Sequence, residues 1–568
     1  MAANSKIAPD LQSANPNSTA RVIVQYSQAP PVSSSLLVNL LEGTLNEVLG
    51  LVNALVYTVP VSSLSAIASD PNVVYISPDR SLSGQLDYSA AAVNASAAWQ
   101  SHLTGAGVSV AVIDSGIDLS PDLSTLILLP RVVYSQDFTG GNSSDQYGHG
   151  THVAGIIAAN GFSSNCLNCT QSFVGIAPSA SLVNLRVLDA NGMGSDSAVI
   201  AAIQRAIALK PLYNIRVINL SLGRPIYESY KLDPLCQAVE AAWKAGIVVV
   251  VAAGNDGRDN SAGTNGYGTV ESPGNDPYVI TVGAMKAMGT YPRTDDLIAS
   301  YSSKGPTAID YIVKPDVVAP GNHVVSLLAP GSTLANDPAN AVPLSYYERT
   351  NSTAASSHFL MLNGTSMATP VVSGAVADLL QAQPSLTPDQ VKARLMKTAY
   401  KTFPTSSSAV DPVTGETFVS QYDMPTIGAG YLDIAAALAN TDLATGTAMS
   451  PGAQFDPTSG NVYLVFDPTS TWNDIDVTYG QAGKGTRGAW STQAVWGTTV
   501  VTKNNAVTGG QNVWANTSTT GFPIIWGTKG VWGTKGVWGT TTTSAEKGVW
   551  GTDSSTSDSD TAFTVIYP

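Results

Sequence analysis

Five short runs rich in valine and isoleucine constrain the fold of this 568-residue chain more than any other feature. Helical patterns such as Ser197–Ala208 and Pro234–Ala245 lie between them. Continuous β-branched runs separated by helices predict an α/β fold with a parallel sheet covered on both faces. Ligand chemistry in such a sheet gathers at the carboxyl ends of its strands. The five runs are Val108–Ile113, Ser181–Leu188, Val217–Leu222, Ile247–Ala253 and Tyr278–Val282.

The composition argues against two classes of function. Charged residues make up only 12% of the chain and its net charge is −14, which disfavours nucleic-acid binding because that function needs a basic face. No apolar run approaches the roughly 20 residues of a membrane-spanning helix. The first residues, Met1–Lys6, carry no signal-peptide core. Few lysines and many small polar residues favour an extracellular protein whose signal was removed over a cytoplasmic one.

The three cysteines predict no zinc site. Cys166 and Cys169 form a single C-x-x-C in a loop-like stretch, which lacks the second half of a zinc motif. A local disulfide is favoured over a redox motif. Cys236 lies in a helical pattern and is expected to be a small buried residue.

Two further regions precede the sheet domain. Residues 1–20 are predicted to be disordered. Residues 21–80 predict a small α+β domain, and residues 81–94 have the composition of a linker. The small domain is expected to hold strands at Arg21–Tyr26, Ala54–Val59 and Val73–Ser77 and helices at Leu36–Leu51 and Val61–Ser69. The sheet domain, residues 95–440, is expected to close with helices at Val371–Gln381, Pro388–Thr398 and Asp433–Ala439.

A region rich in Gly, Thr, Asn and Ser, residues 441–568, follows the sheet domain. It contains eight of the ten tryptophans, and each spacing between them is six or a multiple of six. An even repeat puts these side chains on one face of an extended chain. Three interpretations stay open: a β-rich stack with a tryptophan core, an aromatic strip that binds a cell surface or polymer, and disordered low complexity. The tryptophans are Trp472, Trp490, Trp496, Trp514, Trp526, Trp532, Trp538 and Trp550.

Three stretches carry side chains that could take part in catalysis or metal binding. Asp114 ends the first apolar run, His149 is flanked by glycines ahead of a small-residue helix, and Ser366 precedes the helical run at Val371. Taken singly, they read as a turn residue, half of an H-x-x-H metal pair with His152, and a helix cap. Together they could supply the nucleophile, the base and the orienting acid that serine catalysis needs.

These stretches resemble the three active-site motifs of the subtilisin-like serine proteases, in that family's order. The matching segments are Asp114–Gly116, Gly148–His152 and Gly364–Pro370, and Ala252–Asn255 matches a fourth motif. The resemblance covers about residues 95–440 and implies a three-layer, parallel-sheet peptidase domain.

The resemblance implies a serine endopeptidase that needs no cofactor for its chemistry and acts on polypeptides. Asp114, His149 and Ser366 would form the catalytic triad, and Asn255 would donate its amide to the oxyanion beside the Ser366 N–H. Residues 20–80 resemble the family's inhibitory propeptide, so the chain would be a secreted zymogen matured by autoprocessing within Arg80–Tyr88. Two rival functions are an adhesive protein that uses the protease domain only for maturation, and a catalytically dead relative.

The resemblance also suggests where substrate would bind. Substrate strands should lie antiparallel to Ser221, Leu222 and Gly223, and to Gly192, Met193, Gly194 and Ser195. Asp256 and Glu271 match positions near the P1 pocket, and acids there would favour a basic P1 residue such as Arg80. Leu82, Leu86 and Tyr88 in the processing region offer a hydrophobic alternative.

The chain departs from the family pattern at several places. Val371 and Val372 follow Pro370 where the family usually has a histidine, and activity is expected to survive. Gly331–Phe359 is longer than in compact members and is expected to be a surface insertion. The loop Gly161–Phe173 is also enlarged. In relatives that loop helps to bind calcium, and Asp122 matches the carboxylate ligand, so a structural calcium is expected there.

Overall fold

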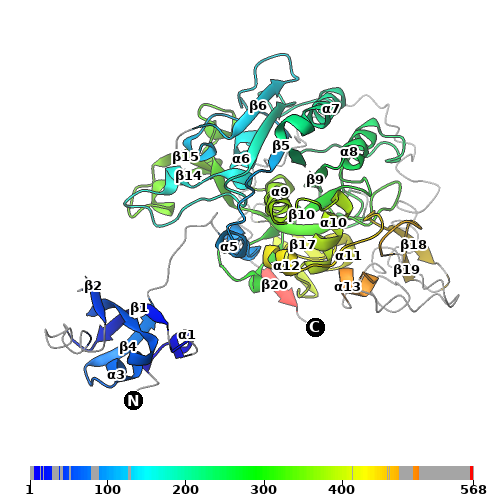
Figure 1. Ribbon diagram of the computed structural model, residues 1–568. Coiled ribbons are helices and arrows are strands. Elements are labelled where there is room, and N and C mark those ends of the chain that lie inside the picture. The colour runs from blue at the N-terminus through cyan, green and yellow to red at the C-terminus, as the bar shows by residue number, and fades with distance from the viewer. Residues whose placement is uncertain are drawn as a thin grey trace. The chain divides into compact units, whose positions relative to one another are not determined.

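The chain folds into two compact units, which divide between Ser83 and Gly84 (Figure 1). Residues 80–87 of the predicted processing region and the tryptophans from Trp514 onwards lie outside the described residues. The computed structural model describes residues 6–12, 15–16, 18–28, 38, 43–49, 53–78, 88–125, 129–261, 263–411, 414–456, 458, 461–472, 490–497, 500 and 563–566.

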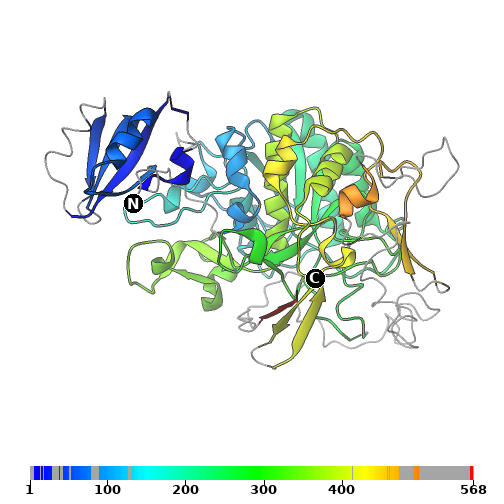
Figure 2. The same ribbon diagram turned by 90° about the horizontal axis from the view of Figure 1, so that it is seen from below.

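The smaller unit is a four-stranded antiparallel sheet of order β2-β3-β1-β4 with helix α3 packed against it (Figure 2). The predicted helix Leu36–Leu51 is wrong over residues 44–49, which form an edge strand. A Cβ on Gly43, directly before this strand, would lie 2.4 Å from Val38 Cγ1, and pairing with β3 sets the extended conformation of the residues that follow. The elements are α1 (Pro9–Gln12), β1 (Thr19–Tyr26), β2 (Thr44–Leu49), β3 (Ala54–Pro60), α3 (Leu64–Ala68) and β4 (Val73–Pro78).

The larger unit is built on an eight-stranded sheet of order β11-β10-β9-β8-β5-β7-β6, in which β12 also pairs with β10. Every pairing is parallel except that of β10 with β11. The five predicted apolar runs correspond to β5, β7, β8, β9 and β10. The strands are β5 (Ser109–Asp114), β6 (Val132–Asp137), β7 (Ser181–Arg186), β8 (Ile215–Leu220), β9 (Val248–Ala252), β10 (Ile280–Lys286), β11 (Leu297–Ile298) and β12 (Val317–Asn322).

Helices cover both faces of this sheet. Every residue of β5 and β9 is buried, and successive side chains of a strand point to opposite faces, so neither face is open to water. Helix α6 (His149–Ala158) packs with α9 (Thr365–Ala382), and α7 (Asp196–Tyr213) packs with α8 (Pro234–Lys244) (Figure 1). The remaining helices are α4 (Ser89–Ala92), α5 (Ala95–Gln100), α10 (Pro388–Thr398), α11 (Met424–Ile427), α12 (Ile434–Ala439) and α13 (Thr492–Trp496).

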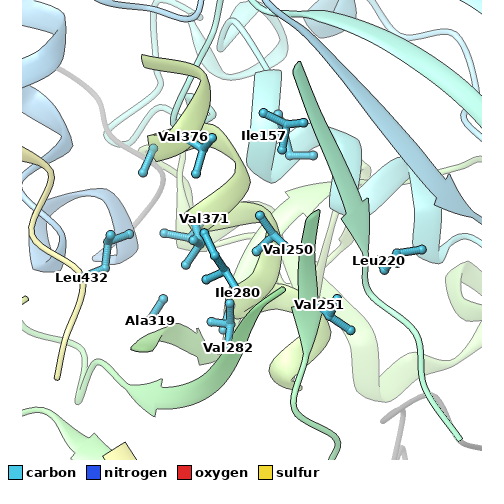
Figure 3. Close-up of a cluster of buried hydrophobic side chains, with 14 of the residues drawn as sticks. Ile157, Leu220, Val250, Val251, Ile280, Val282, Ala319, Val371, Val376 and Leu432 are labelled. Atoms are coloured by element: carbon cyan, nitrogen blue, oxygen red, sulfur yellow. The ribbon is translucent and has the colours of Figure 1, made fainter. Parts of the chain in front are cut away.

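Helix α9 lies at the centre of the larger core. Its residues from Thr365 to Leu380 are all buried. Figure 3 shows Val371 and Val376 on this helix near Val250 and Ile280 of the sheet. Because the helix is fixed by apolar contacts along its length, its first turn is held rigidly at the edge of the sheet.

Residues beyond 440 belong partly to this core, so the predicted domain boundary at 440 is not a boundary between compact units. Trp472 and Trp496 are 2% exposed, and their ring centroids lie 5.3 Å apart. The Trp472 indole donates to the carbonyl of Met449. Two tryptophans of the repeat are therefore part of the hydrophobic core of the larger unit.

Smaller sheets complete the larger unit. Strand β20, near the C-terminus, pairs with β16. Strands β13, β14 and β15 form a sheet that includes part of the predicted insertion. These strands are β13 (Val324–Leu327), β14 (Ala341–Pro343), β15 (Ala355–Leu362), β16 (Ser406–Val410), β17 (Thr417–Gln421), β18 (Gly452–Asp456), β19 (Asn461–Val465) and β20 (Phe563–Ile566).

Candidate active site

Asp114 and His149 meet at the carboxyl end of β5. Asp114 is the last residue of that strand, and His149 is the first residue of α6. Asp114 Oδ1 lies 2.8 Å from His149 Nδ1, and both residues are 1% exposed. A carboxylate on Nδ1 fixes that nitrogen as the protonated one, which leaves Nε2 as an acceptor. Among the described residues, Nε2 has no hydrogen-bond partner.

Close backbone contact explains the glycine after His149. A Cβ on Gly150 would lie 2.2 Å from the carbonyl oxygen of Gly116. Only glycine therefore allows the start of α6 to approach the turn that follows β5. The Gly-His-Gly pattern is thus a packing requirement that places the imidazole against Asp114.

Asp145 supports this arrangement, and the sequence analysis missed it. Its carboxylate accepts the N–H of Gly148 at 2.6 Å and that of Thr151 at 2.7 Å, so it caps α6. It also accepts the hydroxyl of Ser115, which in turn accepts the N–H of Gly150. A carboxylate one turn ahead of a predicted helix is a capping signal, and it could have identified Asp145.

Burial and charge act in opposite directions on the imidazole. Burial alone lowers the pKa of His149, but the Asp114 carboxylate more than offsets it, and the pKa is raised above its ordinary value. Burial raises the pKa of Asp145 despite its hydrogen bonds. The site thus holds a histidine that accepts a proton more readily than one in water.

Ser366 is the second residue of α9, at the N-terminal end of the buried helix. Gly364 before it has φ of 145°, a conformation that favours glycine. Ser366 is 3% exposed, and its hydroxyl donates to the carbonyl of Ser221 at 3.2 Å. The Ser221 hydroxyl donates in return to the carbonyl of Ser366 at 2.8 Å. This pair of bonds ties the serine turn to the end of β8.

Asn255 is held beside the same turn. It follows β9, and its Oδ1 accepts the N–H of Thr365 at 2.9 Å and the Thr365 hydroxyl at 3.2 Å. A donor on Oδ1 assigns that atom as the oxygen, so the amide NH₂ is the group left to donate elsewhere. Ser366 and Asn255 therefore come from different strand ends but meet through Thr365.

His152 does not combine with His149 to bind a metal. Its Nε2 lies 3.1 Å from the carbonyl of Val324 and 3.3 Å from that of Leu360, so it donates between β13 and β15. Burial lowers its pKa to about 3, which keeps it neutral. Within the described part of the chain, no group of three or more His, Cys, Asp or Glu residues could hold a metal ion.

The two predicted substrate-binding segments follow neighbouring strands. Ser221–Gly223 continues from β8, and Gly192–Ser195 lies between β7 and α7. A Cβ on Gly223 would lie 2.4 Å from Glu271 Oε2, and one on Gly192 would lie 2.6 Å from the Tyr147 ring. A side chain therefore fills the space that a Cβ would need at each of these two glycines.

Glu271 lies beneath two of these elements. Its carboxylate packs under Gly223, and its Cγ would lie 2.8 Å from a Cβ on Gly254, which precedes Asn255. Glu271 is 6% exposed. Burial, with a smaller contribution from the Asp256 charge, raises the pKa of Glu271 to about 8. Glu271 therefore lies next to one of the predicted substrate-binding segments, and it is largely protonated at neutral pH.

The surroundings of Asp122 do not fit the expected calcium ion. Calcium takes six to eight oxygen ligands. Here the buried Asp122 carboxylate already accepts the N–H and the hydroxyl of Ser163. The backbone carbonyl of Asp122 accepts a 2.8 Å bond from the Arg131 guanidinium, which also binds the carbonyls of Ser124, Ala158 and Ala180. Protein donors, including a buried cation, thus occupy the oxygens that calcium would need.

The disulfide prediction is confirmed, because Cys166 and Cys169 are bonded, and Cys236 is a buried free cysteine. The disulfide loop contacts the predicted insertion, since the Thr170 N–H donates to the carbonyl of Tyr347.

The described helices include none that combines the length and apolar character needed to cross a bilayer.

Comparison with known proteins identifies the family of the chain. The family model described as the subtilase family (Peptidase_S8) matches residues 105–423, which is 319 of the 568 residues. The chain therefore belongs to the subtilase family, the subtilisin-like serine proteases. Its sheet with helices on both faces is the three-layer α/β fold of that family.

Three relatives illustrate the match. The serine protease AprX of Bacillus subtilis (strain 168) is 39% identical over 301 residues, which cover 52% of this chain and 61% of that protein. Subtilisin E of the same organism is 36% identical over 355 residues, covering 61% and 76%. The alkaline protease of Shouchella clausii is 34% identical over 354 residues, covering 60% and 74%. The chain thus spans less than two thirds of the length of AprX.

Proposed function

We propose that the chain is a secreted serine endopeptidase that hydrolyses peptide bonds through Asp114, His149 and Ser366. The observation that carries this proposal is the buried 2.8 Å contact between Asp114 and His149, which leaves Nε2 of the imidazole unpaired. Ser366 is the second residue of a buried helix, so its N–H is one of the four at the start of α9 that have no partner within the helix.

In this mechanism Ser366 Oγ attacks the carbonyl carbon of the peptide bond as Nε2 of His149 takes its proton. Asp114 holds the imidazole in the required tautomer and stabilises its charged form without being protonated. The same proton passes to the leaving amine, and water then hydrolyses the acyl-enzyme by the reverse path. Asn255 and the Ser366 N–H donate to the oxyanion of each tetrahedral intermediate.

An active-site label tests the proposal directly. A phosphonofluoridate reacts with a serine hydroxyl only where a neighbouring base activates it. We expect one equivalent of label on the peptide that contains Ser366, read by mass spectrometry, and none on His149→Ala. The exposed Ser261 serves as control, because Ser261→Ala should label like the parent. Label on several serines, or undiminished label on His149→Ala, would contradict the proposed base.

The smaller unit would act as an inhibitory propeptide. Support comes from its separate hydrophobic core and from the division of the chain into two compact units. Cleavage within Arg80–Tyr88 would release the enzyme from the zymogen. Secretion is supported by the Cys166–Cys169 disulfide, because disulfides persist mainly outside the reducing cytosol.

The substrate backbone would pair with Ser221–Gly223 on one side and Gly192–Ser195 on the other. Support comes from their place at the carboxyl ends of the sheet, beside Ser366, whose hydroxyl contacts Ser221. Met193, 49% exposed, would lie at the rim of the groove. Extended peptides bind in this way through main-chain hydrogen bonds.

The P1 preference should depend on pH. Because burial raises the pKa of Glu271 to about 8, its carboxylate becomes charged as pH rises through that value. We expect the ratio of kcat/KM for Arg over Leu at P1 to rise between pH 7 and 9, by roughly tenfold for one ion pair formed in a largely buried site. Glu271→Gln should abolish the rise. A ratio independent of pH in the parent would argue for the hydrophobic alternative.

The overall rate should also depend on pH, because His149 must be neutral to accept a proton. Burial lowers its pKa, but the charge and hydrogen bond of Asp114, with a smaller contribution from the Asp145 charge, raise it by more, so the folded-state value lies above 6.5. Activity is therefore lost as pH falls through this raised pKa. We expect the acidic limb of kcat/KM to have its midpoint above 6.5, and Asp114→Ala to move the midpoint of the residual activity below it. An identical midpoint in both proteins would contradict this assignment.

A further inference from the structure

A partly buried ion-pair network lies immediately beyond both proposed substrate-binding segments. Arg224 follows Gly223, and Asp196 follows Ser195. Arg224 Nε lies 3.0 Å from each carboxylate oxygen of Asp196, and Nη2 lies 2.8 Å from Oδ2. The residues that directly follow the two segments are therefore joined by a multidentate ion pair.

The same guanidinium is anchored in the core. Its Nη2 lies 2.9 Å from Oδ1 of Asp233, whose side chain is fully buried. Asp233 caps α8 through the N–H of Leu235 and accepts the hydroxyl of Ser272 at 2.7 Å. A buried carboxylate without a cation would be strongly destabilising, so Asp233 fixes the position of Arg224.

The backbone of Arg224 is fixed as well. Its N–H donates to the carbonyl of Ser272 at 2.9 Å, and its carbonyl accepts the Ser272 N–H at 2.8 Å. Ser272 directly follows Glu271, which lies beneath Gly223. Arg224 thus joins three elements around the proposed groove: the segment after β8, the start of α7 and the turn that carries Glu271.

An exposed ion pair would contribute little, but this one differs in geometry. The Arg224 side chain is 19% exposed, and its guanidinium contacts both oxygens of Asp196 and one oxygen of the fully buried Asp233, with Glu228 further away at 3.8 Å. Charge-assisted bonds of this multidentate kind are stronger than a single exposed ion pair. Burial by itself lowers the pKa of Arg224. The hydrogen bond to Asp196 and the charges of Asp233 and Asp196 outweigh burial, so the pKa of Arg224 is raised above its ordinary value.

We propose that Arg224 is a positioning residue that sets the separation of Gly192–Ser195 and Ser221–Gly223 through its bonds to Asp196 and Asp233. The proposal rests on the proposed function, in which a substrate strand lies between these segments. A substrate strand that is hydrogen-bonded on both sides requires a fixed distance between the two segments, since hydrogen bonds weaken quickly beyond their normal length. Only substrates long enough to reach this end of the groove depend on the pair.

The test compares two substrates with the same P1 residue, a peptide with four residues before the cleaved bond and an acylated single amino acid. In Asp196→Asn we expect KM for the long substrate to rise about threefold to tenfold relative to KM for the short one, with kcat within roughly twofold. Asp196 is 43% exposed, so the variant should fold. High salt should produce part of the same change in the parent.

Two further variants separate positioning from a structural effect. Arg224→Lys keeps the charge beside Asp233 but loses the planar fork, so it should show an intermediate KM ratio. Arg216→Ala is the matched control: Arg216 lies near the start of β8, where it binds the carbonyls of Pro384 and Leu386, and its loss should leave the ratio unchanged.

The outcomes distinguish this proposal from the proposed function. An unchanged KM ratio in Asp196→Asn, or an equal loss on both substrates, overturns the role of Arg224 while hydrolysis still depends on Ser366. Hydrolysis of either substrate that is equally fast in Ser366→Ala overturns the proposed function, and the positioning role with it.

Discussion

The Ser366→Ala variant is expected to keep the fold and to lose peptidase activity, with kcat reduced by about 10⁴-fold or more, as triad enzymes do when the nucleophile is removed. The fold should survive because the hydroxyl makes one hydrogen bond, to the carbonyl of Ser221, whereas α9 is held by apolar contacts along its length. Activity on a fluorogenic peptide and the melting temperature measure the two effects separately.

Ser373→Ala is the matched control for this variant. Ser373 lies two turns further along α9, is also buried, and donates to the side chain of Asn219 at 2.8 Å. Its loss should lower stability by about 1 kcal/mol, typical of one hydrogen bond, and change kcat only a few-fold. Equal activity of Ser366→Ala and the parent, or an equal loss in both variants, would contradict the nucleophile assignment.

Self-processing offers a second measure of the same variant. If the smaller unit is a propeptide removed by the enzyme itself, the parent should acquire a new N-terminus within Arg80–Tyr88 and Ser366→Ala should persist as the intact chain. Mass spectrometry of the new terminus would also report one P1 residue. Cleavage at the same bond in Ser366→Ala would indicate another protease.

The sheet and the site residues could be predicted because their signals are local. β5 and β9 are buried on both faces, so their sequences are continuously apolar. Asp114, His149 and Ser366 each lie at the end of a strand or the start of a helix, near a glycine. Close packing requires Gly116 and Gly150, and a positive φ favours glycine at Gly364. Four short patterns in order then recovered the family, although no spacing showed that the residues meet.

The network around Arg224 could not be predicted in the same way. Arg224 contacts Asp196, 28 residues earlier in the sequence, and Ser272, 48 residues later. Neither separation along the sequence follows a helical or strand period. The sequence shows an arginine after a glycine, which alone indicates a solvated charge. Only the packing of three elements at one end of the sheet brings it into contact with the buried carboxylate of Asp233.

Two errors had a common cause, namely that tertiary contact overrode local pattern. Residues 44–49 carry a helical pattern but pair with β3, because an exposed strand with one partner needs little apolar periodicity. Trp472 and Trp496 belong to a repeat that looks separate from the peptidase domain, yet each is 2% exposed within its core. The spacing of a repeat identifies equivalent residues, but it does not predict which other residues pack against each of them.

Asn255→Ala is expected to lower kcat about 100-fold or more and to leave KM nearly unchanged. The reason is that the amide would bind the oxyanion of the transition state and not the ground-state carbonyl, and one such donor contributes roughly 2.7–4 kcal/mol. The geometry already assigns Oδ1 of Asn255 to the N–H of Thr365, so the NH₂ group is directed to its other side. Steady-state kinetics on one peptide substrate would measure both constants.

Asn255 also anchors Thr365, so the alanine variant alone would confuse catalysis with support of the serine turn. Asn255→Asp separates the two. Its carboxylate can still accept the Thr365 N–H and hydroxyl, so the melting temperature should stay close to that of the parent, but it offers no donor and adds negative charge where the oxyanion forms. The aspartate variant should therefore lose at least as much kcat as the alanine variant. An aspartate variant with nearly full activity would show that Asn255 supports the turn and that the oxyanion is stabilised by other groups.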